Sequence, residues 1–513
     1  MAARKARDLR INIGFIRKNL RLTAVLPLTL ALSACQVLDL GDEKQTTDLS
    51  VVSNIRPSDT PVIVDNVVRT DRFAKLAATQ HPKILATYGG EYSDPKLERM
   101  IAKAIGRLTT ATDDPNQTFQ ITILNSPNVN AFALPGGYVY VTRGLLALAN
   151  DSAELSAVIA HEMAHVTAKH GVARQKREAD ANLASRVVSE ALQDNETGKQ
   201  ALIRGKLSLA QFSRNQELEA DAIGIKALGR SGYDPFAASR FLSSLGAYTD
   251  FRAANTADDM SLDFLATHPA APQRVELAKN HARLFGAPGI GETDRQAYLD
   301  GIDGLLFGDS PKEGFARGQE FLHPGLGIKF KVPKGYTIEN NKDAVLAAGP
   351  GEFAIRFDGV EVPKNLALTD YVKSGWVTGL IDSSVIPATI NGVEAAMGTA
   401  QAERWQFHIT VLRVNGRVYR FLTAAPSNAL GVADAATSVT STFTALSEAE
   451  RLALKPTRVR IVMVKPGDTV GSLSARMVGT DRPQELFRLL NGLSAGQSVS
   501  VGERVKIVTD LAG

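Results

Sequence analysis

One stretch decides the fold of this chain: Ala157-Val158-Ile159-Ala160-His161-Glu162-Met163-Ala164-His165. Its apolar residues are typical of a buried helix, and residues four apart on a helix lie on nearly the same face. His161 and His165 therefore point two imidazoles at one spot, where they can share a metal ion. Glu162, one step round the helix, is placed to take a proton from a water on that metal. The alternative is a pair of surface histidines on a polar helix, and the flanking apolar residues argue against it.

A third ligand is expected farther along the chain, because a catalytic zinc site needs three protein ligands and one open position. Residues 213–224 have a second helical pattern, in which Glu217 and Asp221 are four apart and share a face. Glu217 could complete the site, and Asp221 could hydrogen-bond the far nitrogen of a ligating histidine. Glu219 points away from them and is interpreted as part of a solvated helix face.

The two segments together resemble peptidase family M48, a family of zinc metallopeptidases of the gluzincin type. That family carries HExxH on one helix and ExxxD on a later one. The run from Asn130 to Leu146 also resembles the family's edge strand, and the resemblance extends from about residue 81 to about residue 284. It implies a mainly helical zincin-type domain with a small edge sheet. It also implies one zinc ion (Zn2+) per chain, held by His161, His165 and Glu217, with Glu162 as the general base.

A fourth motif of the resemblance is Thr267-His268-Pro269, followed by Arg274. In envelope members of the family a histidine at this place approaches the metal. His268 could hydrogen-bond the oxyanion of a tetrahedral intermediate, or it could occupy the fourth zinc position and hold the enzyme latent. A helix-capping or loop histidine is the plainer alternative. Arg274 is expected to pair with a nearby carboxylate, and His170, five residues after His165, is a poor match to the ligand face and is interpreted as structural.

The bulk properties exclude some partners. The chain has 513 residues, so several domains are expected. Its net charge is +4, but the first 34 residues hold seven basic side chains against Asp8. That segment alone carries +6, which leaves the rest of the chain near neutral, at −2. No basic stripe indicates a nucleic-acid partner.

The N-terminus resembles a bacterial lipoprotein signal. Residues 1–34 are predicted to be the signal peptide, because a basic stretch is followed by an apolar run too short to span a bilayer. Leu32-Ser33-Ala34-Cys35 resembles a lipobox, whose cysteine is acylated, and Cys35 is the only cysteine. Gln36 in the next position favours the outer membrane, so we expect a periplasmic protein anchored there through Cys35. The alternative is an ordinary signal peptide with an incidental cysteine.

A tether and a peptidase domain are predicted next. Residues 35–75 are polar and irregular, as in a tether, and residues 76–285 form the expected peptidase domain. Within it residues 118–124 alternate as a strand. Residues 137–142 also alternate, and we expect them to be the sheet edge beside the zinc. An extended substrate could pair with such an edge, or the strand could be merely structural.

The pattern changes after a connector at residues 286–320. Residues 321–450 show short alternating strands and a closing helix. This strand-rich α/β sandwich resembles the PsbP/Mog1 fold. It carries no visible catalytic set and is interpreted as a binding or spacing domain.

The last predicted domain, residues 458–510, resembles a LysM module. Its marks are Gly467-Asp468-Thr469 at a turn, Asn491-Gly492 after a helix, and a closing strand. LysM modules have a small βααβ fold and typically bind N-acetylglucosamine polymers, which here implies peptidoglycan. This copy lacks the usual final proline, so it could keep the fold without the sugar groove.

The sequence therefore predicts an α+β multidomain protein and a zinc-dependent endopeptidase of the bacterial periplasm. By family resemblance, its expected substrates are misfolded or stalled envelope proteins, especially unfolded or misassembled outer-membrane proteins. The outer-membrane assembly machinery is a further possible partner. Two alternatives stay open: a non-catalytic chaperone or assembly factor for outer-membrane proteins, and a LysM-guided peptidoglycan endopeptidase.

Overall fold

The structure is a computed structural model that describes residues 72–113, 115, 117–174, 176–177, 196–253, 264, 268, 272–341, 344–480 and 482–510. The predicted signal peptide, its acylation site Cys35 and nearly all of the tether at 35–75 lie outside these residues. Among the described helices, none combines the length and the apolar character needed to cross a bilayer. The mixture of helical and strand-rich regions confirms the α+β multidomain class.

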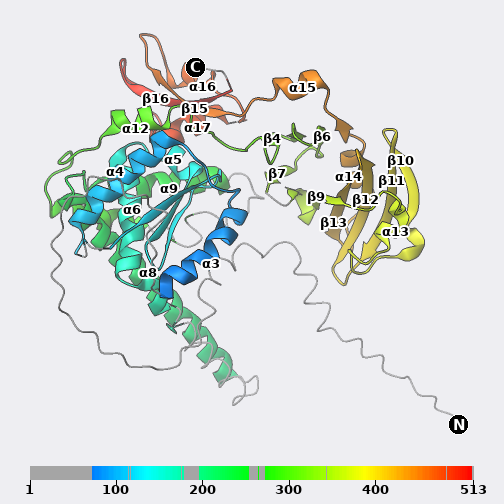
Figure 1. Cartoon of the computed structure of the whole chain (residues 1–513), viewed down its shortest axis with the longest axis horizontal. Helices are drawn as coiled ribbons and strands as arrows, with labels where there is room; N and C mark the ends of the chain where they lie inside the picture. Colours follow the sequence, from blue (N-terminus) through cyan, green and yellow to red (C-terminus); the bar gives the residue numbers. More distant parts are fainter. Residues whose placement is uncertain are drawn as a thin grey trace.

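Helices make up most of the N-terminal half (Figure 1). They are α3 (Arg72–Thr87), α4 (Pro95–Ala111), α5 (Arg143–Leu148), α6 (Ser152–Thr167), α8 (Glu196–Arg230), α9 (Ala237–Ala253), α11 (Pro272–Arg283) and α12 (Arg295–Ile302). The central helix is α6, which begins where the Asp151 carboxylate accepts the backbone N–H of Glu154. Every residue of α6 from Ser152 to Ala164 is buried, so the helix is fixed by packing on all sides.

A three-stranded sheet lies beside these helices, and it corrects one prediction. Its strands are β1 (Gln120–Leu124), β2 (Ala131–Leu134) and β3 (Tyr138–Thr142), in the order β1-β3-β2. The strand predicted at 137–142 to be the edge is therefore central: β3 pairs with β1 in parallel and with β2 antiparallel. The chain turns back at Gly136 and Gly137, both at positive φ, and this hairpin places β2 at the edge beside α6.

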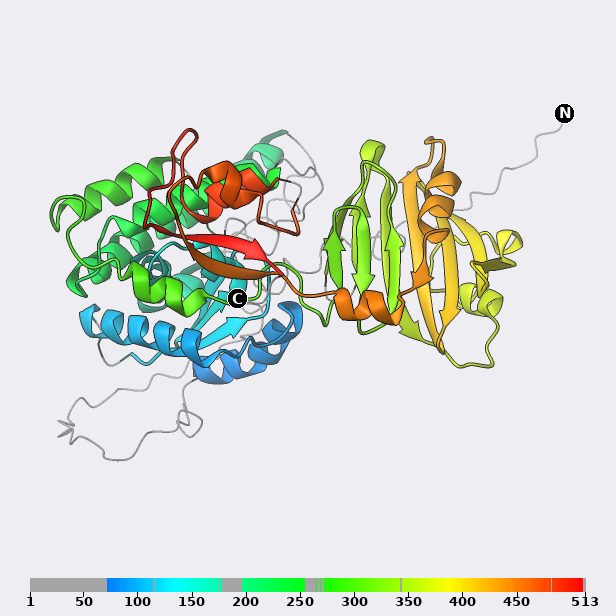
Figure 2. The same cartoon turned by 90° about the horizontal axis from the view of Figure 1, so that it is seen from above.

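The accessory region contains two sheets (Figure 2). The order β10-β11-β12-β13-β9-β8-β7 gives the larger, antiparallel sheet, and β14-β6-β5-β4 the smaller. The bounds are β4 (Phe315–Arg317), β5 (Glu320–His323), β6 (Ile328–Lys331), β7 (Thr337–Asn340), β8 (Val345–Ala348), β9 (Ala354–Glu361), β10 (Ile386–Ile390), β11 (Val393–Gln401), β12 (Trp405–Val414), β13 (Arg417–Pro426) and β14 (Thr444–Ala445).

Short helices complete this region, and its core is aromatic. They are η3 (Pro350–Glu352), α13 (Leu368–Val372), η4 (Asp382–Ser384), α14 (Val432–Thr440) and α15 (Glu448–Ala453). The predicted closing helix is confirmed as α14, which packs on β12 and β13. Phe330, Phe357 and Phe421 meet in one buried cluster, with ring centroids 4.7–5.2 Å apart. Residues on alternate positions of three strands thus supply this core.

The C-terminal module has the predicted βααβ order. It consists of β15 (Arg458–Met463), α16 (Val470–Ser474), α17 (Pro483–Leu490) and β16 (Arg504–Thr509), and its two strands pair antiparallel. The module sits against the N-terminal helices rather than apart from them (Figures 1 and 2). Val459, Phe487 and Val505 belong to the same buried cluster as Leu145 and Leu245 of the helical domain. One hydrophobic core therefore serves both.

A buried lysine ties this module to the peptidase helices. The Lys506 side chain is fully buried, and its Nζ donates to the carbonyl oxygens of Ala147, Leu148 and Ala149 at 2.8, 3.1 and 2.8 Å. These carbonyls lie at the end of α5, where a helix leaves backbone oxygens without internal partners. An ammonium group suits them because a helix carboxyl end also carries partial negative charge. Lys506 thus caps α5 just before α6 begins.

We predict that Lys506→Met destabilises the helical domain as well as the module. The three carbonyls would lose their donor inside the protein, at a cost of about 1–3 kcal/mol. That should lower the melting temperature by at least ~2 °C. Lys465→Met, at an exposed lysine of the same module, is the matched control. Equal melting temperatures for the two variants would contradict the capping role.

Candidate metal centre

Two helices bring the predicted ligands together. His161 and His165 come from α6, and Glu217 comes from α8, which crosses it. The two Nε2 atoms lie 3.0 Å apart, and each is 3.5 Å from a carboxylate oxygen of Glu217. With His268 they form a group whose ligand atoms all lie within 4.8 Å of one another. Among the described residues this is the one group of this kind.

A glycine explains how closely the two helices approach. A Cβ built on Gly224 of α8 would lie only 3.0 Å from the backbone nitrogen of His161. Glu217, Asp221 and Gly224 are spaced i, i+4 and i+7, so they form one stripe along α8. The glycine therefore lets the helix backbones touch, and the two acidic side chains then face α6.

The side chains present fit a zinc ion. Two imidazole nitrogens and a carboxylate form a donor set that zinc prefers in proteins. Three carboxylates (Glu162, Glu217 and Asp221) are buried or nearly so, and in the described part of the chain Arg274 is the guanidinium that contacts two of them, Glu217 and Asp221. With neutral imidazoles and ionised carboxylates the cluster carries a charge of about −2, which a divalent cation balances.

The pKa shifts of His161 and Glu217 also show that this site favours positive charge. Burial alone would lower the pKa of His161, but hydrogen bonds to Asp221 and Glu217 raise it to about 10. Burial would raise the pKa of Glu217, but its electrostatic interaction with His268 and its hydrogen bonds with His161 and His268 lower it well below its ordinary range. The carboxylates thus favour a positive charge at this spot, and a metal ion there would compete with protons for it.

A carboxylate clamped by an arginine stands behind the first histidine. His161 Nδ1 lies 3.0 Å from Asp221 Oδ1. Arg274 holds both oxygens of Asp221, donating from Nε and Nη2 at 2.8 Å each, and its Nη1 lies 3.2 Å from Glu217. Arg274 therefore holds Asp221 close to the far nitrogen of His161, the place expected for a partner of a metal ligand.

Glu162 lies beside the ligand group without belonging to it. Its side chain is 2 % exposed, and the backbone N–H of Ala133 on the edge strand β2 hydrogen-bonds its carboxylate. Burial raises the pKa of this carboxyl group. The other oxygen, Oε1, has no hydrogen-bond partner among the described residues and lies 3.5 Å from His268 Nε2. Glu162 thus offers one free acceptor toward the centre of the site.

His268 enters the site from outside α6 and α8. Its Nδ1 lies 2.8 Å from Glu217 Oε2 and 3.3 Å from His161 Nε2, and its ring stacks on Phe264 with centroids 4.4 Å apart. The backbone N–H of Phe264 donates to the carbonyl of Val129, just before β2. This contact helps to hold the histidine over the ligands.

Two residues that the sequence reasoning set aside also lie here. His170 Nδ1 is 2.9 Å from His165 Nδ1, and His170 Nε2 is 3.3 Å from Glu219 Oε2. The helical spacing rule missed them because α6 ends at Thr167 and Lys169 adopts a φ of 54°, which folds His170 back onto His165. The only signal in the sequence was that one histidine and one glutamate near the ligand motifs had no assigned role.

The comparisons with known proteins agree with this geometry. Residues 92–282 match the model of peptidase family M48. This chain carries a peptidase family M48 domain. The M48 domain is similar to the β-barrel assembly-enhancing proteases of Yersinia pestis and Escherichia coli K12. The first is 32% identical over 37% of this chain and 40% of that protein, and the second is 30% identical over 40% and 43%.

The mitochondrial metalloendopeptidase OMA1 of Arabidopsis thaliana is 31% identical over 37% of this chain and 36% of that protein. The chain spans about half the length, or less, of these relatives. The cyanobacterial PsbP structure from Synechocystis aligns with a TM-score of 0.21 at 18% identity, covering 27% of this chain and 98% of that one. Zinc is the metal of family M48, and the His/Glu group supplies a site for it.

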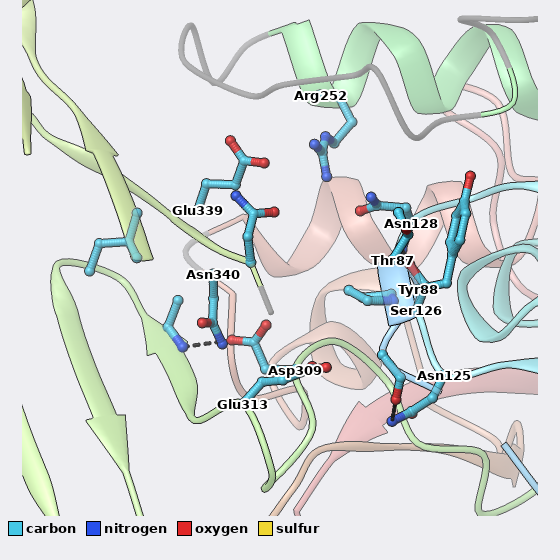
Figure 3. A pocket seen from close by; sticks show the side chains of 15 residues that line it. Thr87, Tyr88, Asn125, Ser126, Asn128, Arg252, Asp309, Glu313, Glu339 and Asn340 are labelled. Carbon is cyan, nitrogen blue, oxygen red and sulfur yellow. Dashed lines mark hydrogen bonds between the residues drawn. The ribbon is translucent and has the colours of Figure 1, made fainter. Parts of the chain in front are cut away.

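A separate cavity of about 220 Å³ lies between the M48 domain and the accessory region (Figure 3). Asn125 and Asn128 line one wall and Glu339 and Asn340 the other, with Asp309 at the base. It shares no residue with the ligand group. The ligand group therefore lies outside this cavity.

We predict that Arg274→Met destabilises the metal-free protein by about 3–5 kcal/mol, because it leaves two buried carboxylates without their cation. Arg283→Met, at an exposed arginine of the same helix, should change the free energy of unfolding little. Urea unfolding of both variants in a chelator measures the difference. Similar unfolding curves would mean that Arg274 is not needed to hold the carboxylates.

Proposed function

We propose that this chain is a zinc-dependent endopeptidase of the bacterial periplasm that hydrolyses polypeptides. One observation carries the proposal: His161, His165 and Glu217 converge while the Glu162 carboxylate stands beside them with a free oxygen. This is the arrangement that metal-assisted hydrolysis requires, a donor set for the metal and a separate proton acceptor. The family match over residues 92–282 supports it.

The residues have distinct roles in this reaction. Zinc, when bound, lowers the pKa of a water molecule and polarises the scissile carbonyl. Glu162 accepts the proton of the attacking water on its carboxylate and returns it to the leaving amine. The raised pKa of Glu162 brings the carboxyl closer to the pH at which it can both accept and release a proton. His161, His165 and Glu217 hold the metal, and Asp221 with Arg274 orients His161.

We propose that the substrate backbone binds along the edge strand β2. Its inner side pairs with β3, and its Ala133 N–H reaches Glu162, so the strand runs directly past the proton acceptor. An extended peptide that adds to this edge would bring its scissile bond beside Glu162. The strand at 137–142 cannot have this role, because both of its sides are already paired.

We propose unfolded or misassembled outer-membrane proteins as the substrates, with the outer-membrane assembly machinery as a further partner. The names of the relatives in Yersinia pestis and Escherichia coli, β-barrel assembly-enhancing proteases, support this choice. The lipobox-like Leu32-Ser33-Ala34-Cys35 supports attachment to the outer membrane through Cys35. The LysM-like C-terminal module would add an affinity for peptidoglycan, and its βααβ order supports that module type.

The first test is Glu162→Gln. The amide keeps the size of the side chain but cannot accept the proton, so we expect one zinc per chain and a loss of casein cleavage of at least ~100-fold. Metal analysis and a cleavage assay on the same samples measure both quantities. Retained cleavage in this variant would overturn the proposed mechanism.

The second test is His268→Ala, which distinguishes the two roles that are open to His268. If His268 occupies a metal position and holds the enzyme latent, its removal should raise cleavage. If it stabilises the oxyanion, cleavage should fall ~100- to 1,000-fold with zinc retained. The position of Nδ1 among the ligand atoms supports the first outcome. Unchanged cleavage would assign His268 neither role.

A non-catalytic assembly factor is the second candidate. The observation that favours it is the fourth ligand-type side chain, since His268 placed against Glu217 could keep the centre closed. Barrel assembly in a cell that carries only Glu162→Gln distinguishes the two functions. Normal assembly in that cell favours the assembly factor, and a defect favours the peptidase. Cleavage of purified sacculi would instead support the peptidoglycan endopeptidase.

A further inference from the structure

A second histidine stands behind His165, where His161 has a carboxylate. The two histidines face each other through Nε2, so Nδ1 of each is the far nitrogen. For His161 that nitrogen lies 3.0 Å from Asp221, whose side chain is 10% exposed and is held by Arg274. For His165 it meets His170 Nδ1 at 2.9 Å, and His170 in turn meets Glu219 at 3.3 Å.

We propose that His170, backed by Glu219, is a positioning residue that fixes the tautomer and the ring orientation of His165. We call Glu219, His170 and His165 the relay. The inference rests on the proposed metal site and deepens it, because it assigns the partner of the second ligand. His170 and Glu219 do not touch the metal position themselves.

The protons on the two neutral rings of the relay can be arranged in only one way. A neutral His165 that offers the Nε2 lone pair to a metal carries its proton on Nδ1, and that N–H donates to His170 Nδ1. His170, also neutral, then carries its proton on Nε2 and donates it to the Glu219 carboxylate. With both rings neutral, no other arrangement satisfies both contacts. The carboxylate thus selects the tautomer of His170, and His170 selects that of His165.

The surroundings hold His170 in place for this task. Its side chain is buried, and Gln216, one position before the ligand Glu217, donates from Nε2 to the His170 carbonyl at 3.0 Å. The rings of His170 and His165 meet edge to face, at 74° with centroids 4.9 Å apart. The left-handed conformation of Lys169, which costs about 1–2 kcal/mol, brings His170 back to this position.

The two ligand histidines therefore differ in how their orientation is secured. Asp221 is almost fully enclosed, whereas the Glu219 side chain is 60% exposed. The relay thus links the second ligand to a carboxylate on the protein surface. Interactions of this kind typically contribute a factor of about 10–100 to metal affinity.

Zinc affinity of the full chain, measured by competition with a chromogenic chelator, tests the relay. His170→Phe keeps the ring but removes both nitrogens, and we expect it to weaken zinc binding about 10- to 100-fold. His170→Asn places an amide near the Nδ1 position and should recover part of that loss. Glu219→Ala should weaken binding several-fold, whereas Glu276→Ala, at a glutamate of equal exposure (59%), should not.

A double variant shows whether the two residues act together. If Glu219 acts through His170, Glu219→Ala should have no further effect in the His170→Phe background. Replacing zinc by Co2+ adds a spectroscopic check, because the absorption bands should shift in His170→Phe if the ligand geometry changes. Melting temperatures of the metal-free variants show whether His170→Phe folds. If His170→Phe does not fold, the zinc affinities of His170→Asn and Glu219→Ala test the relay instead.

The outcomes separate this inference from the proposed function. If His170→Phe folds, wild-type zinc affinity and unchanged Co2+ bands in that variant would overturn the relay alone. If it does not fold, the same result in both single variants, His170→Asn and Glu219→Ala, would overturn it. A wild-type chain that binds zinc tightly but cleaves nothing would overturn the proposed peptidase and leave the relay standing. Additive effects of His170→Phe and Glu219→Ala would overturn the link through His170.

Discussion

The contact between α6 and α8 is the constraint on which the rest of the site depends. At Gly224 the two helix backbones lie so close that a Cβ atom there would be only 3.0 Å from the backbone nitrogen of His161. That contact sets the distance across which Glu217 reaches the two imidazoles and Asp221 reaches His161. A side chain at this position would push the helices apart by a few tenths of an ångström or more, so the donor set would converge less closely. The metal centre is therefore a property of helix packing as much as of its ligands.

Burying so many carboxylates requires compensation, and the structure supplies it in two ways. Arg274 neutralises one charge through hydrogen bonds to Asp221 and a contact with Glu217. The remaining negative charge is gathered at the ligand atoms, where protons on histidines or a divalent cation can balance it. The exposed Glu219 needs no such compensation, because water solvates it. This contrast explains why the sequence pattern indicated that Glu219 is a surface residue, although Glu219 also contacts His170.

Much of the site could be predicted because it follows from helical spacing. His161 with His165, and Glu217 with Asp221, are four apart, and that spacing alone puts each pair on one face. His170 could not be found this way, since the rule assumes a continuous helix and Lys169 interrupts it. The edge strand was misplaced because strand alternation shows which residues share a face but not which neighbours a strand has. Lys506 looked like an ordinary strand residue, and nothing local indicates that its partners end α5 in another domain.

These long-range contacts hold both ends of the helix that carries the HExxH motif. At its beginning, Lys506 caps the carbonyls before Asn150, and Arg295 joins the Asn150 carbonyl to that of Arg504 in the C-terminal module. At its end, His170 packs on His165 and is held by Gln216 of α8. A catalytic constellation is most accurate when it stands on rigid, well-supported elements. The C-terminal module thus has a structural role for the metal centre that is independent of any ligand it binds, because it fixes the position from which α6 starts.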